Sequence, residues 1–170
     1  PESPSSARRN SSEVLFVCLQ MRLLLPVLIS TTMSSLHPQP ISGWPAEVKE
    51  IQVTSTAAGT VQPSLAWSPK DDGKPQPLLV GLHTWSGDYR QSSNGPTFMR
   101  WAMQHGWHFV APSFRGANHT PFALGSDRAV QDIVDAVNFM KKSGKVDADR
   151  VYLIGASGGG HMSLLMAGRH

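Results

Sequence analysis

The fold is decided by one stretch near the end of the chain, Val151-Tyr152-Leu153-Ile154-Gly155-Ala156-Ser157-Gly158-Gly159-Gly160. Four consecutive apolar residues are typical of a strand that is buried on both faces of a sheet. The glycines after them allow a tight turn, and the apolar residues between positions 162 and 166 favour a helix. The stretch therefore predicts a strand, a sharp turn centred on Ser157 and a helix in direct succession.

The residues before this stretch alternate between strand and helix patterns. Continuous apolar runs predict buried strands at 78–82 and 107–111. Apolar side chains at three- and four-residue spacing predict a helix from the N-cap Ser126 to about Lys142, and a shorter helix is expected at 96–104. Strands that alternate with helices form a parallel sheet, so the predicted fold class is α/β.

The part of the chain before residue 68 predicts an antiparallel hairpin. Residues 47–54 and 60–67 have extended patterns, and Ala58-Gly59 can form the turn between them. A polar turn is expected at Asp147–Arg150, just before the last strand. We therefore expect a hairpin, then parallel strands with helices, and finally the helix that follows Ser157.

The turn at Ser157 fits the G-x-S-x-G pattern of a nucleophile elbow, from Gly155 to Gly159. In such an elbow the serine lies on a strained turn, and side chains at the flanking glycines would collide with neighbouring backbone. The helix that follows points free N–H groups and its positive dipole end at the same place. The Gly158 N–H is therefore a candidate donor to the oxyanion of an acyl transfer.

Three segments upstream of the elbow extend this pattern. They are His83-Thr84-Trp85-Ser86-Gly87, Phe114-Arg115-Gly116 and Asp147-Ala148-Asp149-Arg150. Over residues 75–170 their order resembles the prolyl oligopeptidase family of serine hydrolases, in which a His-Gly-Gly loop, an Asn-Tyr-Arg-Gly segment and a G-x-S-x-G-G elbow follow one another. The resemblance implies an α/β-hydrolase fold and cleavage of a peptide or ester bond through an acyl-enzyme on Ser157.

The sequence departs from that family at two places. Thr84 and Trp85 replace the two glycines of the His-Gly-Gly loop, and Ser113-Phe114 replaces Asn-Tyr. In α/β-hydrolases this loop supplies the second oxyanion donor. We assign that donor to the Trp85 backbone N–H, with the Thr84 N–H as the rival assignment.

The catalytic base and acid have no candidate after the nucleophile. A serine hydroxyl needs a base that is held by a carboxylate, and in this fold both follow the serine in the chain. After Ser157 the sequence has no acidic residue, and its histidines there are His161, expected on the helix surface, and His170. We expect the triad Asp and His beyond the chain end, so that the hydrolase domain is truncated at its C-terminus and the 170-residue chain is inactive alone.

Two other functions fit parts of the same pattern. The turn Gly155–Gly160 also resembles the Gly-rich turn of an NAD(P)-binding oxidoreductase, where it would contact a pyrophosphate. A hydrolase-like module without catalytic activity is the other alternative function. The same residues could also form a tight strand-to-helix turn that has no catalytic role.

The N-terminal region predicts export. Met21 and Arg22 precede a short apolar run and then small polar residues, which is typical of a secretory signal peptide. The protein is then secreted or periplasmic, and it is cytoplasmic if this interpretation is wrong. The expected organisation is a disordered or untranslated extension at 1–20, a signal peptide at 21–35, a Pro-rich linker at 36–46 and the N-terminal part of the catalytic domain at 47–170.

Composition restricts the partners. The formal net charge of +3 comes without a basic run, which argues against nucleic acid binding. The single cysteine, Cys18, cannot form an internal disulfide or a cysteine metal cluster. The apolar run after Met21 is shorter than the roughly 20 residues of a membrane span. We expect a peptide or a small acyl compound as substrate, no cofactor and no metal.

Overall fold

A computed structural model describes residues 40–170. The predicted extension at 1–20 and the predicted signal peptide at 21–35 lie outside the described residues. Within residues 40–170, no helix combines the length and the apolar character that a membrane crossing needs.

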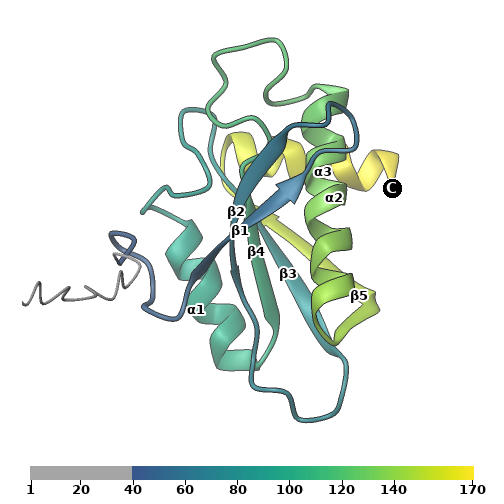
Figure 1. The fold of residues 1–170 in the computed structure, drawn as a ribbon. Coiled ribbons are helices and arrows are strands. Elements are labelled where there is room, and N and C mark those ends of the chain that lie inside the picture. The colour runs from purple at the N-terminus through teal and green to yellow at the C-terminus, as the bar shows by residue number, and fades with distance from the viewer. Residues whose placement is uncertain (1–39) are drawn as a thin grey trace, which may run out of the picture. The chain divides into compact units, whose positions relative to one another are not determined.

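Five strands form one sheet (Figure 1). Their bounds are β1 Lys49–Thr54, β2 Val61–Trp67, β3 Gln76–Leu82, β4 His108–Pro112 and β5 Val146–Gly155. The spatial order is β1-β2-β4-β3-β5, with β1–β2 and β2–β4 antiparallel and β3–β4 and β3–β5 parallel. The predicted hairpin and the predicted parallel sheet are therefore both confirmed.

Three helices cover the two faces of the sheet. Their bounds are α1 Gly95–His105, α2 Asp127–Ser143 and α3 Gly158–Arg169. The predicted cap of α2 is confirmed, because the Ser126 hydroxyl accepts a hydrogen bond from the Ala129 N–H at 3.1 Å. Helix α1 packs on one face, and α2 and α3 pack on the other (Figure 1).

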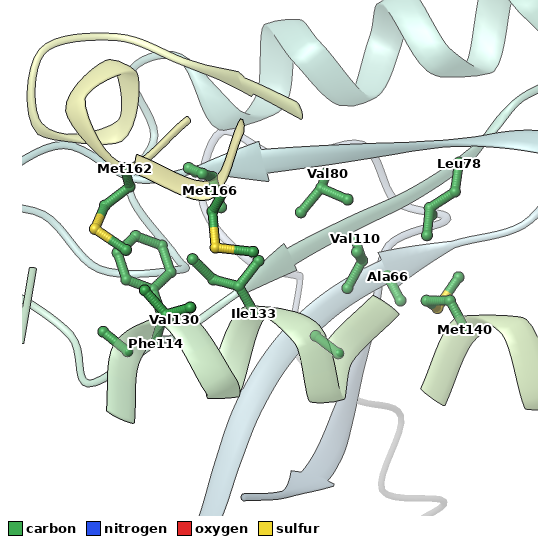
Figure 2. Close-up of a cluster of buried hydrophobic side chains, with 13 residues drawn as sticks. Ala66, Leu78, Val80, Val110, Phe114, Val130, Ile133, Met140, Met162 and Met166 are labelled. Carbon is green, nitrogen blue, oxygen red and sulfur yellow. The ribbon is translucent and has the colours of Figure 1, made fainter. Parts of the chain in front are cut away.

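Strand β3 is buried on both faces, as its continuous apolar run predicts. Leu78, Val80 and Leu82 contact the hydrophobic cluster beneath α2 and α3, part of which Figure 2 shows. Leu79, between them in the strand, faces the cluster beneath α1 together with Phe109. Full burial of one such side chain stabilises a fold by about 1.5–3 kcal/mol, so this strand anchors both layers.

Residues 40–46, predicted as part of a linker, pack on the domain instead. Trp44 is buried in the cluster beneath α1, and its indole N–H donates to the Arg90 carbonyl at 3.1 Å. A Cβ at Gly95 would lie 2.6 Å from the Trp44 ring, so the first turn of α1 is shaped to receive it. The prolines of this segment predicted a linker, but burial of the large Trp44 side chain fixes the segment on the domain.

The polar turn predicted at 147–150 lies inside a strand. Gln76 pairs with Val146 and Leu78 pairs with Val151, so β5 carries extra residues that bulge out of the ladder. Within the bulge, Asp147 accepts hydrogen bonds from the Asp149 N–H and the Arg150 side chain, which closes the turn. The polar turn was predicted correctly, but the sequence did not predict that strand pairing resumes before it, at Val146.

Candidate active site

The predicted nucleophile lies at the junction of β5 and α3. Ser157 has φ 53° and ψ −119°, a positive-φ conformation that non-glycine residues rarely adopt. Its side chain makes no capping hydrogen bond to α3, and the residue is exposed. Such strain costs about 1–3 kcal/mol and persists only where the surroundings enforce it. The turn is therefore sharp and strained, and it leaves the hydroxyl available.

The glycines on both sides of Ser157 are required by close backbone contacts. A Cβ at Gly155 would lie 2.5 Å from the Gly159 carbonyl oxygen, and a Cβ at Gly159 would collide with the Leu82 carbonyl oxygen at the end of β3. Backbone atoms cannot move aside as a flexible side chain can. As the sequence pattern predicted, Gly155 and Gly159 are needed because a larger residue at either position would clash with the backbone.

A third close contact joins the elbow to the loop after β3. A Cβ at Gly158 would lie 2.5 Å from the Trp85 backbone nitrogen and 2.8 Å from its Cα. The Gly158 N–H is the first of α3, where helical N–H groups have no partner in the helix. Among residues 40–170, neither this N–H nor the Trp85 N–H donates to another residue. Two unused backbone donors from separate elements therefore lie beside Ser157.

The rival donor on this loop is already occupied. The Thr84 N–H donates to the side-chain oxygen of Gln91 at 3.1 Å. The geometry therefore favours Trp85 over Thr84 as the second donor.

His83 has the position of a supporting residue. Its Nε2 lies 2.7 Å from the Ser113 carbonyl oxygen, and its Nδ1 lies 2.9 Å from the Thr84 carbonyl oxygen. The ring stacks on Phe114 with centroids 3.8 Å apart. Burial lowers the pKa of His83 below its usual value, although the two carbonyls act against this shift. A neutral imidazole has one N–H, so the ring donates to one of these two carbonyls, and its burial against Phe114 fits a role in supporting the loop.

The turn after β4 carries the Phe114 ring and is itself strained. Phe114 and Arg115 have φ values of 30° and 77°. The Arg115 guanidinium forms two hydrogen bonds to the Asp132 carboxylate of α2, at 2.6 and 3.1 Å, and the Asp132 side chain has no exposed surface. It also donates to Ser55 at 2.9 Å. This ion pair holds the strained turn against α2 and the β1–β2 turn.

Sequence reasoning missed the role of Asp132. The signal was present, because Asp132 and Asp135 occur among the apolar positions of a helix predicted to face the core. Acidic side chains at such positions are rarely buried without a partner. Asp135 binds the Thr56 N–H at 2.6 Å and the Thr56 hydroxyl at 2.9 Å. Both carboxylates therefore tie α2 to loops of the sheet.

His161 lies one turn into α3, where the sequence placed it. It is exposed, and its backbone N–H donates to the Ser157 carbonyl at 3.0 Å. The part of the chain that the structure describes brings no His, Asp or Glu side chain into hydrogen-bond contact with the Ser157 hydroxyl. No group of three or more His, Cys, Asp or Glu residues among residues 40–170 could hold a metal ion.

A cleft of about 700 Å³ lies next to this site and not over it. Residues 86–92 form one wall, and Ser113 with residues 115–117 forms another. Ser157, Trp85 and Gly158 do not line it. The cleft is therefore a neighbour of the loop after β3, and the three candidate site residues lie outside its lining.

A comparison with known protein families shows which family the chain belongs to. Residues 66–170, which carry both the loop and the elbow, match the BD-FAE family. The chain belongs to the BD-FAE family. Its fold is the α/β-hydrolase fold, as the sequence predicted, and the family is hydrolase-like. No curated protein sequence matches the chain.

Solved structures share the fold at low sequence identity. An acetyl xylan esterase from Paenibacillus sp. R4 is 22% identical with a TM-score of 0.57, over 79% of this chain and 48% of that one. An esterase from Pyrobaculum calidifontis is 23% identical with a TM-score of 0.53, over 78% and 40%. An acylaminoacyl peptidase from Pyrococcus horikoshii is 21% identical with a TM-score of 0.54, over 69% and 20%. This BD-FAE chain thus spans half or less of the length of each of these three proteins.

Proposed function

We propose that the chain carries the nucleophile of a serine hydrolase. Ser157 is the nucleophile, and the Gly158 and Trp85 N–H groups bind the oxyanion. The observation that carries the proposal is the strained Ser157 at a strand-to-helix junction, with the Trp85 amide against Gly158. Loss of one oxyanion donor typically costs roughly 2.7–4 kcal/mol in the reaction barrier.

The proposed reaction has two acyl-transfer steps. The Ser157 Oγ bonds to the acyl carbon while its proton passes to a base, which we expect outside residues 1–170 together with its carboxylate partner. The carbonyl oxygen becomes an oxyanion that faces the two N–H groups. The leaving group then departs with the proton, and the acyl group stays on Ser157. Water repeats the sequence, releases the carboxylic acid and restores the serine.

We propose a carboxylic ester as the bond that is cleaved. Support comes from the hydrolase-like family and from two neighbours that are named esterases. A peptide bond is the second candidate, because a third neighbour is named a peptidase and the motif order resembles prolyl oligopeptidases. The substrate in either case is a small acyl compound or a peptide.

The oxidoreductase alternative lacks support in the fold. The sheet has the order β1-β2-β4-β3-β5 with two antiparallel pairings, unlike the mostly parallel sheet of order 3-2-1-4-5-6 that binds dinucleotides. The Gly-rich turn is also packed against the Trp85 backbone, where a pyrophosphate would need room. A module without activity remains the alternative that an experiment must address.

The test compares ester and peptide substrates in the intact protein. We expect turnover of p-nitrophenyl acetate, weaker or no turnover of an aminoacyl p-nitroanilide, and covalent labelling by a fluorophosphonate. The matched control is Ser157→Ala, which should abolish turnover and labelling. The 170-residue chain alone should be inactive. Equal turnover by the Ser157→Ala protein, or an unlabelled intact protein, would contradict the proposal.

A further inference from the structure

The loop after β3 is fastened by a side chain that follows it in the sequence. The side-chain oxygen of Gln91 accepts two hydrogen bonds from Thr84, one from its N–H at 3.1 Å and one from its hydroxyl at 2.9 Å. The turn itself closes when the Gly87 N–H donates to the Thr84 carbonyl at 3.3 Å. One amide oxygen thus binds both donors of the first residue of the turn.

Gly87 is part of the same arrangement. A Cβ at this position would lie 3.0 Å from the Thr84 hydroxyl oxygen, and it would collide with the Gln91 side-chain oxygen. The turn therefore has space for the Gln91 amide only because residue 87 lacks a side chain. Thr84, Gly87 and Gln91 form one locked unit, which we call the Gln91 lock.

The Gln91 lock determines which N–H of the turn stays available. The Thr84 carbonyl shares one peptide plane with the Trp85 N–H, and it accepts from the Gly87 N–H and lies 2.9 Å from the His83 Nδ1. Among residues 40–170, no residue accepts from the Trp85 N–H, and its nitrogen lies against Gly158. The Thr84 N–H is thus engaged by Gln91, whereas the Trp85 nitrogen lies against Gly158, the residue that follows Ser157.

We propose that Gln91 is a positioning residue for the oxyanion site, an inference that rests on the proposed function. It acts through Thr84 and does not contact the reacting atoms. In many α/β-hydrolases glycines shape this loop, and here a side-chain amide holds a Thr-Trp turn in their place. Because an oxyanion forms only during the reaction, loosening the lock should lower kcat more than it raises KM.

Two substitutions at Gln91 test this role in the intact protein. Gln91→Met keeps the length of the side chain and removes the acceptor, and we expect kcat for p-nitrophenyl acetate to fall about 10- to 100-fold, less than for the complete loss of a donor. KM should change by less than about twofold. Gln91→Glu keeps an acceptor oxygen and should recover most of the lost kcat.

A second pair of variants covers the case in which Gln91→Met fails to fold. Thr84→Val removes only the hydroxyl bond to Gln91, and kcat should fall by a smaller factor, about threefold to tenfold, since one of two bonds remains. Thr84→Ser keeps that bond and should retain more kcat than Thr84→Val. Hydrogen exchange supplies a readout apart from activity: the Thr84 N–H should lose protection in Gln91→Met and keep it in Thr84→Ser.

The outcomes separate the two proposals. Wild-type kcat in both Gln91→Met and Thr84→Val, with Ser157-dependent turnover intact, overturns the role of Gln91 and leaves the proposed function standing. A rise in KM with unchanged kcat also overturns it, since that pattern indicates a substrate contact. A wild-type protein without Ser157-dependent turnover overturns the proposed function, and the catalytic role of Gln91 fails with it.

Discussion

Two strained turns follow β4 and β5, the strands on either side of β3. Ser157 in the elbow and Phe114 with Arg115 in the other turn are the non-glycine residues with positive φ among residues 40–170. Ser157 is exposed with a free hydroxyl, whereas Phe114 is buried against His83 and among Met162 and its neighbours (Figure 2). The same kind of strain thus exposes one side chain and buries another.

The difference lies in what enforces each turn. The elbow is held by glycines that let backbone segments approach, and its serine is exposed and makes no capping hydrogen bond. The turn after β4 is held by its own side chains, through the Phe114 stack and the Arg115–Asp132 ion pair. Changes in the supporting turn should therefore lower stability, while changes at the elbow and its partner loop should alter activity first.

The largest expected effect is on the supporting turn. Asp132→Asn leaves a guanidinium that is 13% exposed without its partner, and removal of one member of a buried pair typically costs about 3–5 kcal/mol. We expect a loss of this size in the free energy of unfolding, measured with urea. The control Asp127→Asn, whose carboxylate pairs with Arg169 and is 93% exposed, should change it by less than about 0.5 kcal/mol. Equal losses in the two variants would contradict the comparison.

The next effect concerns the partner loop of the elbow. Trp85→Pro removes the N–H that we assign to the oxyanion, at the second position of a turn where proline is often tolerated. We expect kcat to fall about 10²- to 10³-fold, or roughly 2.7–4 kcal/mol in the barrier. Trp85→Ala keeps the N–H and should retain kcat within a few-fold. If the alanine variant loses as much as the proline variant, the Trp85 side chain and not its amide carries the effect.

A smaller effect is expected on the free energy of unfolding when Ser157 in the elbow is replaced by glycine. Ser157→Gly removes the strain of a positive φ, which costs the wild type about 1–3 kcal/mol of stability. The greater backbone entropy of glycine in the unfolded chain costs the variant roughly 0.5–1 kcal/mol. The inactive variant should therefore be more stable than the wild type by about 1 kcal/mol. Ser163→Gly, in the interior of α3, should be less stable by a similar amount. A Ser157→Gly protein that is less stable than wild type would show that the serine is not strained.

The smallest effect is a dependence of stability on pH through His83. Because burial lowers its folded pKa, the unfolded chain binds more protons below its usual pKa of about 6.5. Its contribution is therefore full above about pH 6.5 and is lost as the pH falls through the folded pKa. The free energy of unfolding should decrease from pH 7 to pH 5, with a shallower slope in His83→Asn. An unchanged slope would contradict burial of a neutral ring.

Local sequence patterns predicted most of the fold. The apolar run of β3, the Ser126 cap of α2 and the glycines around Ser157 are signals within a few residues, and each has the expected local structure. The bulge at Asp147–Arg150 was harder, because strand pairing on its far side depends on Gln76, a residue about 70 positions earlier.

Side-chain contacts between distant segments could not be predicted. The Arg115–Asp132 pair and the burial of Trp44 depend on which elements become neighbours, and the strand order decides that. Gln91 lies in a polar loop, and its contact with Thr84 depends on a turn geometry that the sequence pattern does not predict. The strained strand-to-helix turn at Ser157 could therefore be predicted from the sequence, and the side-chain contacts that support it could not.

The structure of the intact protein after reaction with a fluorophosphonate tests the central claim most directly. The account predicts a covalent bond from the Ser157 Oγ to phosphorus, with the phosphoryl oxygen about 3 Å from the backbone nitrogens of both Trp85 and Gly158. An adduct on another residue, or a phosphoryl oxygen on Ser157 that points away from these two amides, would contradict it.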